Sequence, residues 1–221
     1  KDARNSEIEG RHSQAGGVAA TFAIDAQQSI EAGWTGGTER RFYDTVSSTK
    51  GGYRSTYDID RSQAHVGWQG RFEGWRGRVQ AYRSEIDIVN SASNGVTATR
   101  PQNLLDEVID GHATVKLGGH QVTFGGEWRD ETLTNAGLTT GRDSATHKAL
   151  FVQDEVALGS SLMLTGGLRA DNHELFGSEV SPRPYLVWEA SPALVVKGGF
   201  GHAFKAPTLK QMAPNYVGAA G

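Results

Sequence analysis

Apolar and polar residues alternate along most of this chain. In the segment 121–131, QVTFGGEWRDE, the residues Val122, Phe124 and Trp128 fall on one face of an extended strand, and Glu127 falls on the other. Successive side chains of a strand point to opposite faces, so a period of two predicts strands with one apolar and one polar face. The same alternation recurs in segments 16–25, 62–68, 112–117, 161–171 and 193–200.

The pattern predicts about ten long strands and an all-β, antiparallel fold. Glycine and β-branched residues inside the segments disfavour helices, and helix-capping signals are scarce. The expected strands are 11–24, 28–44, 53–69, 74–90, 99–117, 121–135, 145–158, 161–174, 179–190 and 194–207. A strand of about 17 residues is roughly 55 Å long, whereas strands of soluble proteins average about 5–6 residues. This length favours a transmembrane β-barrel over a soluble sandwich.

The expected connections alternate in length along the chain. Tight turns fall at 25–28, 70–75, 117–121, 158–161 and 189–193, and longer polar links fall at 44–53, 90–101 and 135–146. Short periplasmic turns and long extracellular loops are typical of outer-membrane barrels. Trp68 and Trp75 flank one short turn, where an interfacial aromatic belt is expected. A soluble antiparallel protein with one wet face remains the alternative from the pattern alone.

Composition and motifs exclude several other classes of protein. The 221 residues include no Cys, so disulfides and thiolate metal sites are excluded, and the formal net charge of −3 gives no nucleic-acid footprint. No apolar run is long enough for a transmembrane helix. The seven His show no metal-binding spacing, and the sequence has no Walker, nucleophile-elbow or dinucleotide-binding motif. We therefore expect neither an enzyme nor a protein-ligated metal.

The C-terminal part carries a resemblance to a known family. The stretches GLRADNH (167–173), FGSEVSPRPYLVW (176–188) and GGFGHAFKAPTLKQMAPNY (198–216) resemble the barrel of TonB-dependent outer-membrane receptors of the ferric enterobactin and colicin I receptor type. ALFVQDEVAL (149–158) is similar to the strand before them. In that family a strand ends in an F-K-A-P-[ST]-L motif and runs into an extracellular loop. The resemblance implies that Lys205 and Pro207 lie where a strand leaves the membrane.

The resemblance also implies an activity and a wider architecture. Such receptors have a plug domain inside a barrel of 22 strands, so residues 1–221 are expected to form a partial barrel domain of about ten strands, without the plug or the C-terminal strands. The implied function is TonB-dependent import of an iron–siderophore, with a ferric catecholate as the expected cargo, across the outer membrane of a Gram-negative bacterium. The implied partners are the siderophore, the TonB complex acting through the plug, outer-membrane lipid, and bacteriocins or phages. Haem, cobalamin or another siderophore is the alternative cargo, and a passive porin or soluble all-β binding module the alternative class.

A ferric catecholate predicts the chemistry of its binding site. It is a bulky anion with aromatic rings, so Arg should meet its charge and aromatic side chains should stack on it. Iron would be held by siderophore oxygens, and no resident cofactor is expected. The candidates at strand tops and on long links are Arg41, Tyr43, Tyr53, Arg54, Tyr57, Arg100 and Arg142. Further inside the strands, we expect an ion-pair lattice made by Arg76, Arg78, Arg129, Arg169, Arg183 and Lys197 with Glu127, Glu155 and Asp171.

Overall fold

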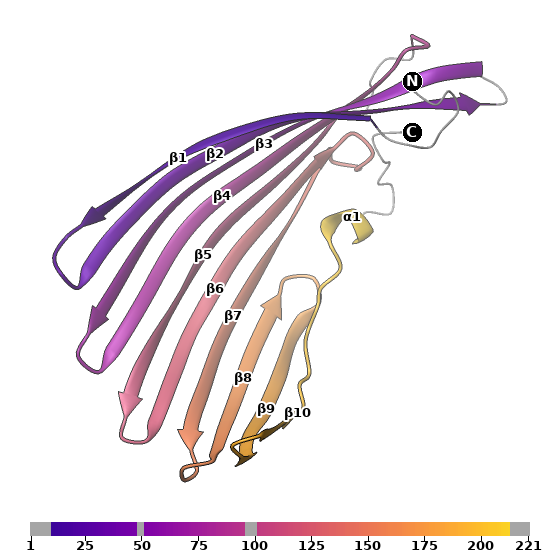
Figure 1. The fold of residues 1–221 in the computed structure, drawn as a ribbon. Coiled ribbons are helices and arrows are strands. Elements are labelled where there is room, and N and C mark those ends of the chain that lie inside the picture. The colour runs from indigo at the N-terminus through magenta and orange to yellow at the C-terminus, as the bar shows by residue number, and fades with distance from the viewer. Residues whose placement is uncertain (1–9, 48–50, 96–100, 213–221) are drawn as a thin grey trace.

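The computed structural model describes residues 10–47, 51–95 and 101–212, which form one curved antiparallel sheet (Figure 1). Each strand pairs with its neighbours in the chain, so the order is β1 to β10 without a crossover. The strands are β1 Gly10–Ala23, β2 Gln28–Ser47, β3 Gly51–Phe72, β4 Trp75–Ala92, β5 Gln102–Leu117, β6 His120–Asn135, β7 Arg142–Ala157, β8 Leu162–His173, β9 Gly177–Ser191 and β10 Leu194–Gly199. The predicted all-β, ten-stranded antiparallel architecture is confirmed.

The tenth strand is shorter than the sequence predicts. It ends at Gly199 rather than at residue 207. Its partner β9 contains Pro182 and Pro184, whose carbonyls still accept hydrogen bonds from the backbone of His202 and Phe200, at 3.1 and 3.0 Å. Proline has no N–H to donate in return. Hydrogen bonds therefore run in one direction only at this point of the ladder. Regular pairing stops at Gly199, before Pro207, where the sequence predicted the strand to end.

The two ends of the sheet differ in their connections. We call one the short-turn end, with turns at 24–27, 73–74, 118–119, 158–161 and 192–193, and the other the loop end, with links at 48–50, 93–101, 136–141 and 174–176. The loop-end links are shorter than predicted because the strands continue into them. Phe42, Tyr43 and Thr45, for example, favour the extended backbone of β2. The β2–β3 hairpin consequently occupies most of the predicted link 44–53.

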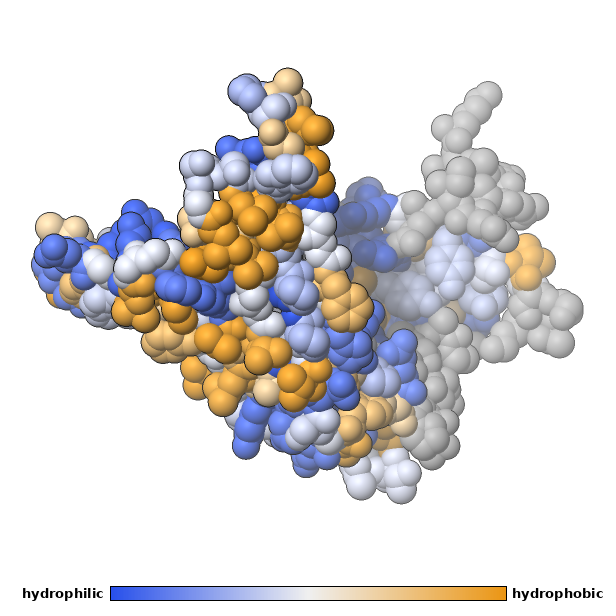
Figure 2. Space-filling view, turned by 90° about the horizontal axis from the view of Figure 1, so that it is seen from below, coloured by the Kyte–Doolittle hydropathy of each residue, from blue (hydrophilic) through white to orange (hydrophobic). Residues whose placement is uncertain are grey.

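The pairing register divides the sheet into two faces. The outward face carries the large exposed apolar side chains, such as Val66, Val79, Ile109, Phe124 and Leu150. Exposed apolar surface of this extent suits contact with lipid. Toward the loop end, polar side chains replace it on the same face: Thr38, Ser62, Arg83, Glu107 and Asp130. Figure 2 shows patches of apolar residues among polar ones on the side seen from the short-turn end. The strands thus extend beyond an apolar band.

Aromatic side chains mark the short-turn end of the apolar band. The rings of Phe72 and Trp75 stack with centroids 4.5 Å apart, and Trp68 lies 6.4 Å from Trp75. The amphipathic rings of Trp68 and Trp75 suit the level of lipid headgroups. Among the described residues, no helix has the length and apolar character needed to cross a membrane.

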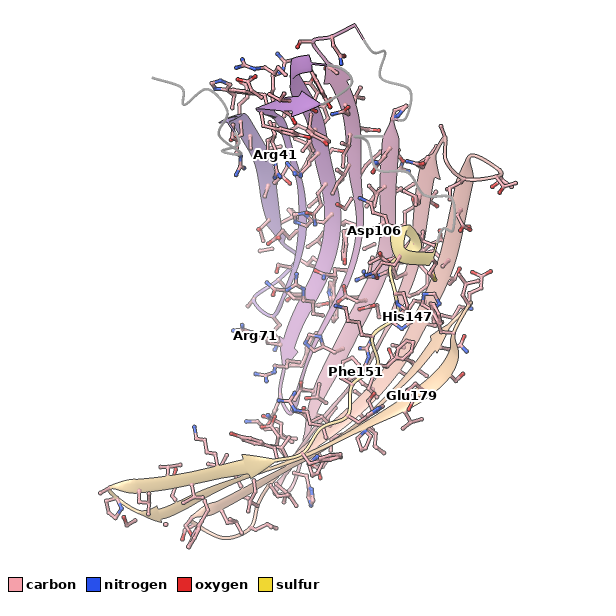
Figure 3. The ribbon with its side chains drawn as sticks, turned by 90° about the vertical axis from the view of Figure 1, so that its right-hand side faces the viewer. Arg41, Arg71, Asp106, His147, Phe151 and Glu179 are labelled. Atoms are coloured by element: carbon pink, nitrogen blue, oxygen red, sulfur yellow. The ribbon has the colours of Figure 1, made fainter. Side chains whose placement is uncertain are left out.

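The segment after β10 crosses the inward face of the sheet (Figures 1 and 3). It ends in the short helix α1, Leu209–Met212. Gln211 accepts a hydrogen bond from the backbone N–H of Thr208 at 3.0 Å, as the reaching-back half of a capping box does. Leu209 packs with Leu133 and Ala145 in the one buried apolar cluster seen among the described residues. The FKAPTL motif is therefore an ordered connection rather than the end of a strand.

Candidate functional site

An aromatic and cationic surface lies on the inward face near the loop end. Tyr43 of β2 and Tyr57 of β3 stack, with ring centroids 6.2 Å apart and planes 22° from parallel. Arg41 lies directly opposite Tyr57 in the register, so its side chain shares their face. Both strands extend past the apolar band here. The residues are therefore positioned where an aqueous ligand could reach them.

Three arginines surround one carboxylate beside these rings. Glu39 accepts hydrogen bonds from Arg11 at 2.9 Å, from Arg61 at 3.0 Å, and from Arg41. We call Arg11, Arg41 and Arg61 around Glu39 the arginine cluster. Glu39 is only 5% exposed, whereas the arginine side chains are 39–59% exposed. Three positive charges thus share one negative charge and remain accessible to an anion.

The electrostatics keep this cluster net positive at neutral pH. The hydrogen bond from Arg41, together with those of Arg61 and the charge of Arg11, holds the pKa of Glu39 below its usual value. Glu39 therefore stays ionised, and the arginines stay charged throughout the physiological range. The four side chains of the cluster together carry two more positive charges than negative ones. An anionic ligand would be attracted to it.

A hollow of about 550 Å³ adjoins the arginine cluster on the inward face. It is lined by small residues, including Ser13, Ala15 and Gly37, and also by Arg11 and Arg61. A Cβ on Gly37 would lie 2.8 Å from the carbonyl oxygen of Gln14 and 2.9 Å from the Cβ of Ala15. A larger residue would therefore disturb the pairing of β1 with β2. Small side chains leave room beside the charges.

The structure separates the seven candidates that the sequence suggested. Arg41, Tyr43, Tyr53 and Tyr57 share the inward face. Arg54 lies on the opposite, outward face, where it forms a bidentate pair with Asp44 at 2.8 and 3.0 Å. Its guanidinium also lies 4.9 Å from the centre of the Phe42 ring. Adjacent residues of a strand point to opposite faces, so Arg54 cannot join Tyr53 in one site.

The remaining two candidates do not join the inward group. Arg142 begins β7 on the outward face and donates a hydrogen bond to the hydroxyl of Thr132 at 3.3 Å. Arg100 lies outside the described residues. The candidate site is therefore limited to the inward face of β1, β2 and β3, near the loop end.

Sequence reasoning missed Arg11, Glu39 and Arg61. The parity of Arg61 with Tyr57 within one strand was a usable signal, because both have odd numbers in the same alternating segment. What the sequence lacked was the register. Only the pairing of Gly37 with Arg61 and of Ser13 with Glu39 brings three strands to one carboxylate.

A second inward network supports part of the predicted ion-pair lattice. Arg129 lies 3.7 Å from Glu127, Arg169 lies 2.9 Å from Asp171, and His147 lies 3.0 Å from Asp171. The ring of His147 is also 6.3 Å from that of Phe204, so the crossing segment rests on this network (Figure 3). In the part of the chain that the structure describes, no three His, Cys, Asp or Glu are grouped to hold a metal ion.

Comparison with protein families defines the class of protein. Residues 6–221 match the family described as TonB dependent receptor-like, beta-barrel. The match covers nearly the whole chain, so the protein belongs to this family. The family consists of receptors rather than enzymes.

Individual relatives include an iron-regulated outer-membrane protein and a ferric enterobactin receptor. The chain is 33% identical over 127 residues to the iron-regulated outer membrane virulence protein of Vibrio cholerae, a match covering 56% of this chain and 20% of that protein. It is 35% identical over 115 residues to the ferric enterobactin receptor PirA of Pseudomonas aeruginosa, covering 43% and 16%. The chain thus spans a fifth or less of these relatives.

A solved structure matches the fold over almost the whole chain. The crystal structure of a mutant ferric enterobactin receptor, PfeA of Pseudomonas aeruginosa, aligns with a TM-score of 0.80 over 97% of this chain and 36% of that one. The sequence identity in this alignment is 21%. The likeness therefore establishes the shared barrel architecture.

Proposed function

We propose that this chain forms part of the wall of an outer-membrane receptor that imports a ferric siderophore into a Gram-negative bacterium. The observation that carries the proposal is the arginine cluster beside the Tyr43–Tyr57 stack, on the inward face at the loop end. The relatives named as ferric enterobactin receptors support a catecholate as cargo. Family membership supports coupling to TonB.

The chemistry of the site fits a ferric catecholate. Guanidinium groups bind oxyanions through charge-assisted hydrogen bonds, and tyrosine rings stack on flat aromatic groups. The cluster offers both within one surface, next to a hollow that could receive part of the ligand. The iron is cargo and stays coordinated by the siderophore oxygens. The protein needs to supply only charge, stacking and shape.

The remaining parts of the proposed cycle lie outside these residues. TonB would act through a plug domain in the parent receptor, and residues 1–221 would contribute a partial barrel domain. The outward apolar band would contact outer-membrane lipid. Bacteriocins or phages would meet the receptor at the loop end, which projects beyond the band.

Ligand binding to the full-length parent receptor in detergent tests this function. Quenching of intrinsic Trp fluorescence by a ferric catecholate would be titrated, with a ferric hydroxamate, haem and cobalamin as competitors. Arg41→Ala and Arg61→Ala should each weaken catecholate binding about tenfold, the equivalent of roughly 1.4 kcal/mol. Arg54→Ala is the matched control, since it removes the same charge from the outward face.

The outcomes separate the parts of the proposal. Equal affinity in the Arg41→Ala, Arg61→Ala and unmodified receptors would remove the arginine cluster from the site. Binding of haem or cobalamin without the catecholate would replace the cargo while retaining the receptor. Binding of none of these ligands would refute the uptake function.

A further inference from the structure

One carboxylate lies within the apolar band of the outward face. The register places the side chain of Asp154 of β7 on the same face as Val122, its direct partner in β6. The other outward carboxylates of the described strands, such as Asp58, Glu107 and Asp130, lie toward the loop end, beyond the apolar band. An ionisable group among lipid-facing apolar residues is costly, so its presence there indicates a function.

A histidine from the neighbouring strand holds this carboxylate. His120 begins β6, and Asp154 lies near the end of β7 at Ala157, so both residues are at the short-turn end. Nδ1 of His120 is 2.7 Å from Oδ2 of Asp154. An ionised carboxylate only accepts hydrogen bonds, so the ring donates through Nδ1. The two side chains are 50% and 39% exposed, and a molecule in the surrounding membrane can therefore reach both.

The second oxygen of Asp154 lacks a donor, and the space beside the carboxylate is open. Among the described residues, none donates a hydrogen bond to the buried Oδ1. Gly166 lies directly opposite Asp154 across the β7–β8 pair, and a Cβ on this glycine would meet no atom within 4 Å. The terminal torsion of an aspartate has broad minima, so the carboxylate can turn Oδ1 toward this space. A donor approaching over Gly166 would satisfy it.

We propose that His120 and Asp154 bind the headgroup of a phospholipid that carries a primary ammonium, as phosphatidylethanolamine does. The ammonium, with three N–H donors, approaches over Gly166 and donates charge-assisted hydrogen bonds to Asp154. The phosphate of the same headgroup lies at His120, whose Nε2–H donates to it when the ring is protonated. The two side chains thus complement the two charges of the headgroup. This site is on the opposite face from the proposed siderophore site and is independent of the cargo.

The position of the pair favours a lipid headgroup over a dissolved metal ion. A row of direct register partners runs across β4 to β7 through Trp75, Val115, Val122 and Asp154. The pair therefore lies at the same end of the apolar band as the aromatic side chains that suit the headgroup level. Within the part of the chain that the structure describes, no third His, Asp or Glu joins the pair to complete a metal site.

Carbodiimide coupling in the full-length receptor tests this site. The receptor would be reconstituted in vesicles of equal parts phosphatidylethanolamine and phosphatidylcholine with the same acyl chains. A lipid-soluble carbodiimide condenses a primary amine with a carboxylate in direct contact, forming an amide, and takes up the water to become a urea. Phosphatidylcholine has no primary amine and cannot react. After digestion, mass spectrometry should find the lipid amide on Asp154.

The same chain supplies matched controls. Glu31 lies 3.1 Å from the ring of His65 and is 49% exposed, but this pair is on the inward face, so Glu31 should carry no lipid. Gly166→Leu fills the open space and should lower the yield at Asp154 roughly tenfold. Gly198→Leu adds the same volume to the outward face of β10, where a Cβ also meets no atom within 4 Å, and should leave the yield unchanged.

Competition between the two lipids measures binding without the coupling reaction. In native mass spectrometry of the receptor in detergent, phosphatidylethanolamine should occupy the first lipid site about tenfold more often than phosphatidylcholine. Asp154→Asn keeps the shape of the side chain but removes its charge, and should abolish this preference. Equal occupancy of the two lipids in the unmodified receptor would overturn the proposal. So would a lipid amide on Glu31 in the same yield as on Asp154, or none on Asp154.

Discussion

Substitution of Leu209 gives the sharpest test of how the segment after β10 is held. Leu209 is 5% exposed and packs against Leu133 and Ala145, which are 0% and 1% exposed. We expect Leu209→Ala to release α1 from the inward face. The helix should detach locally while the strands remain paired, because α1 packs against β6 and β7 near their loop ends and takes no part in the strand ladder.

The magnitude follows from the burial of this side chain. Leu→Ala substitutions in protein interiors destabilise by about 2–5 kcal/mol. The lower part of this range, about 2–3 kcal/mol, applies because a four-residue helix at a surface can adjust around the lost volume. Each 1.4 kcal/mol is a factor of ten, so the detached population should rise roughly 30- to 150-fold.

Limited trypsin digestion of the full-length receptor in detergent measures this population. Lys210 lies within α1, and its peptide bond must leave the helix to be cleaved. When closing is fast, the cleavage rate follows the equilibrium population of the open form. Leu209→Met keeps most of the apolar volume, should destabilise by less than about 1.5 kcal/mol, and therefore serves as the matched control. The same cleavage rate at Lys210 in Leu209→Ala and in the unmodified receptor would refute the packing argument.

Two further predictions concern the sheet itself. Gly125→Ala should lower the thermal unfolding temperature in detergent, because the added Cβ would collide with the carbonyl oxygen of Gly111 and lie 2.7 Å from the ring of Phe151. Gly166→Ala is the control. A Cβ at Gly166 would meet no atom within 4 Å, so this variant should keep the unfolding temperature of the unmodified receptor. The hydrogen bond from Arg54 lowers the pKa of Asp44 below its usual 3.8. A carboxylate with a lowered folded-state pKa stabilises the fold above its unfolded-state pKa, and this stabilisation is lost as the pH falls through the folded-state pKa. A spin label at Val46 of β2, next to this pair, should therefore keep the same mobility from about pH 7 to 5 and gain mobility only below about pH 4. Equal unfolding temperatures for the two Gly variants would contradict the first prediction. A gain in spin-label mobility between pH 7 and 5 would contradict the second.

The strands were predictable because their signal is local. A period of two within one segment already specifies a strand and its two faces, whatever the segment pairs with. The same rule could have separated Tyr53 from Arg54, since neighbours in a strand cannot share a face. The rule does not apply to a loop, and the sequence predicted a loop for residues 44–53. In the structure, the aromatic and β-branched residues of this link extend β2 and β3 through most of it.

The arginine cluster was not predictable because it depends on register between strands. Arg11, Glu39 and Arg61 come from three strands, and a shift of one residue in either pairing would turn a partner to the other face. The end of β10 likewise depends on its partner. Pro182 and Pro184 belong to β9, so nothing within residues 194–207 alone shows where the ladder becomes one-sided.

Cations lie at both ends of the inward face, with Arg41 at the loop end and Arg71, Arg76 and Lys116 at the short-turn end, and the two groups differ in how their aromatic neighbours are placed. At the loop end, Tyr43 and Tyr57 face inward beside Arg41, so charge and stacking can act on the same ligand. At the short-turn end, the aromatic and cationic side chains lie on opposite faces. Phe72 and Trp75 face outward, whereas Arg71 and Arg76 face inward. Charge alone would attract any anion, but stacking is needed to select a catecholate. The Arg71→Gln/Arg76→Gln receptor should therefore keep its catecholate affinity, and a loss of affinity in this variant would show that the ligand also uses the short-turn end.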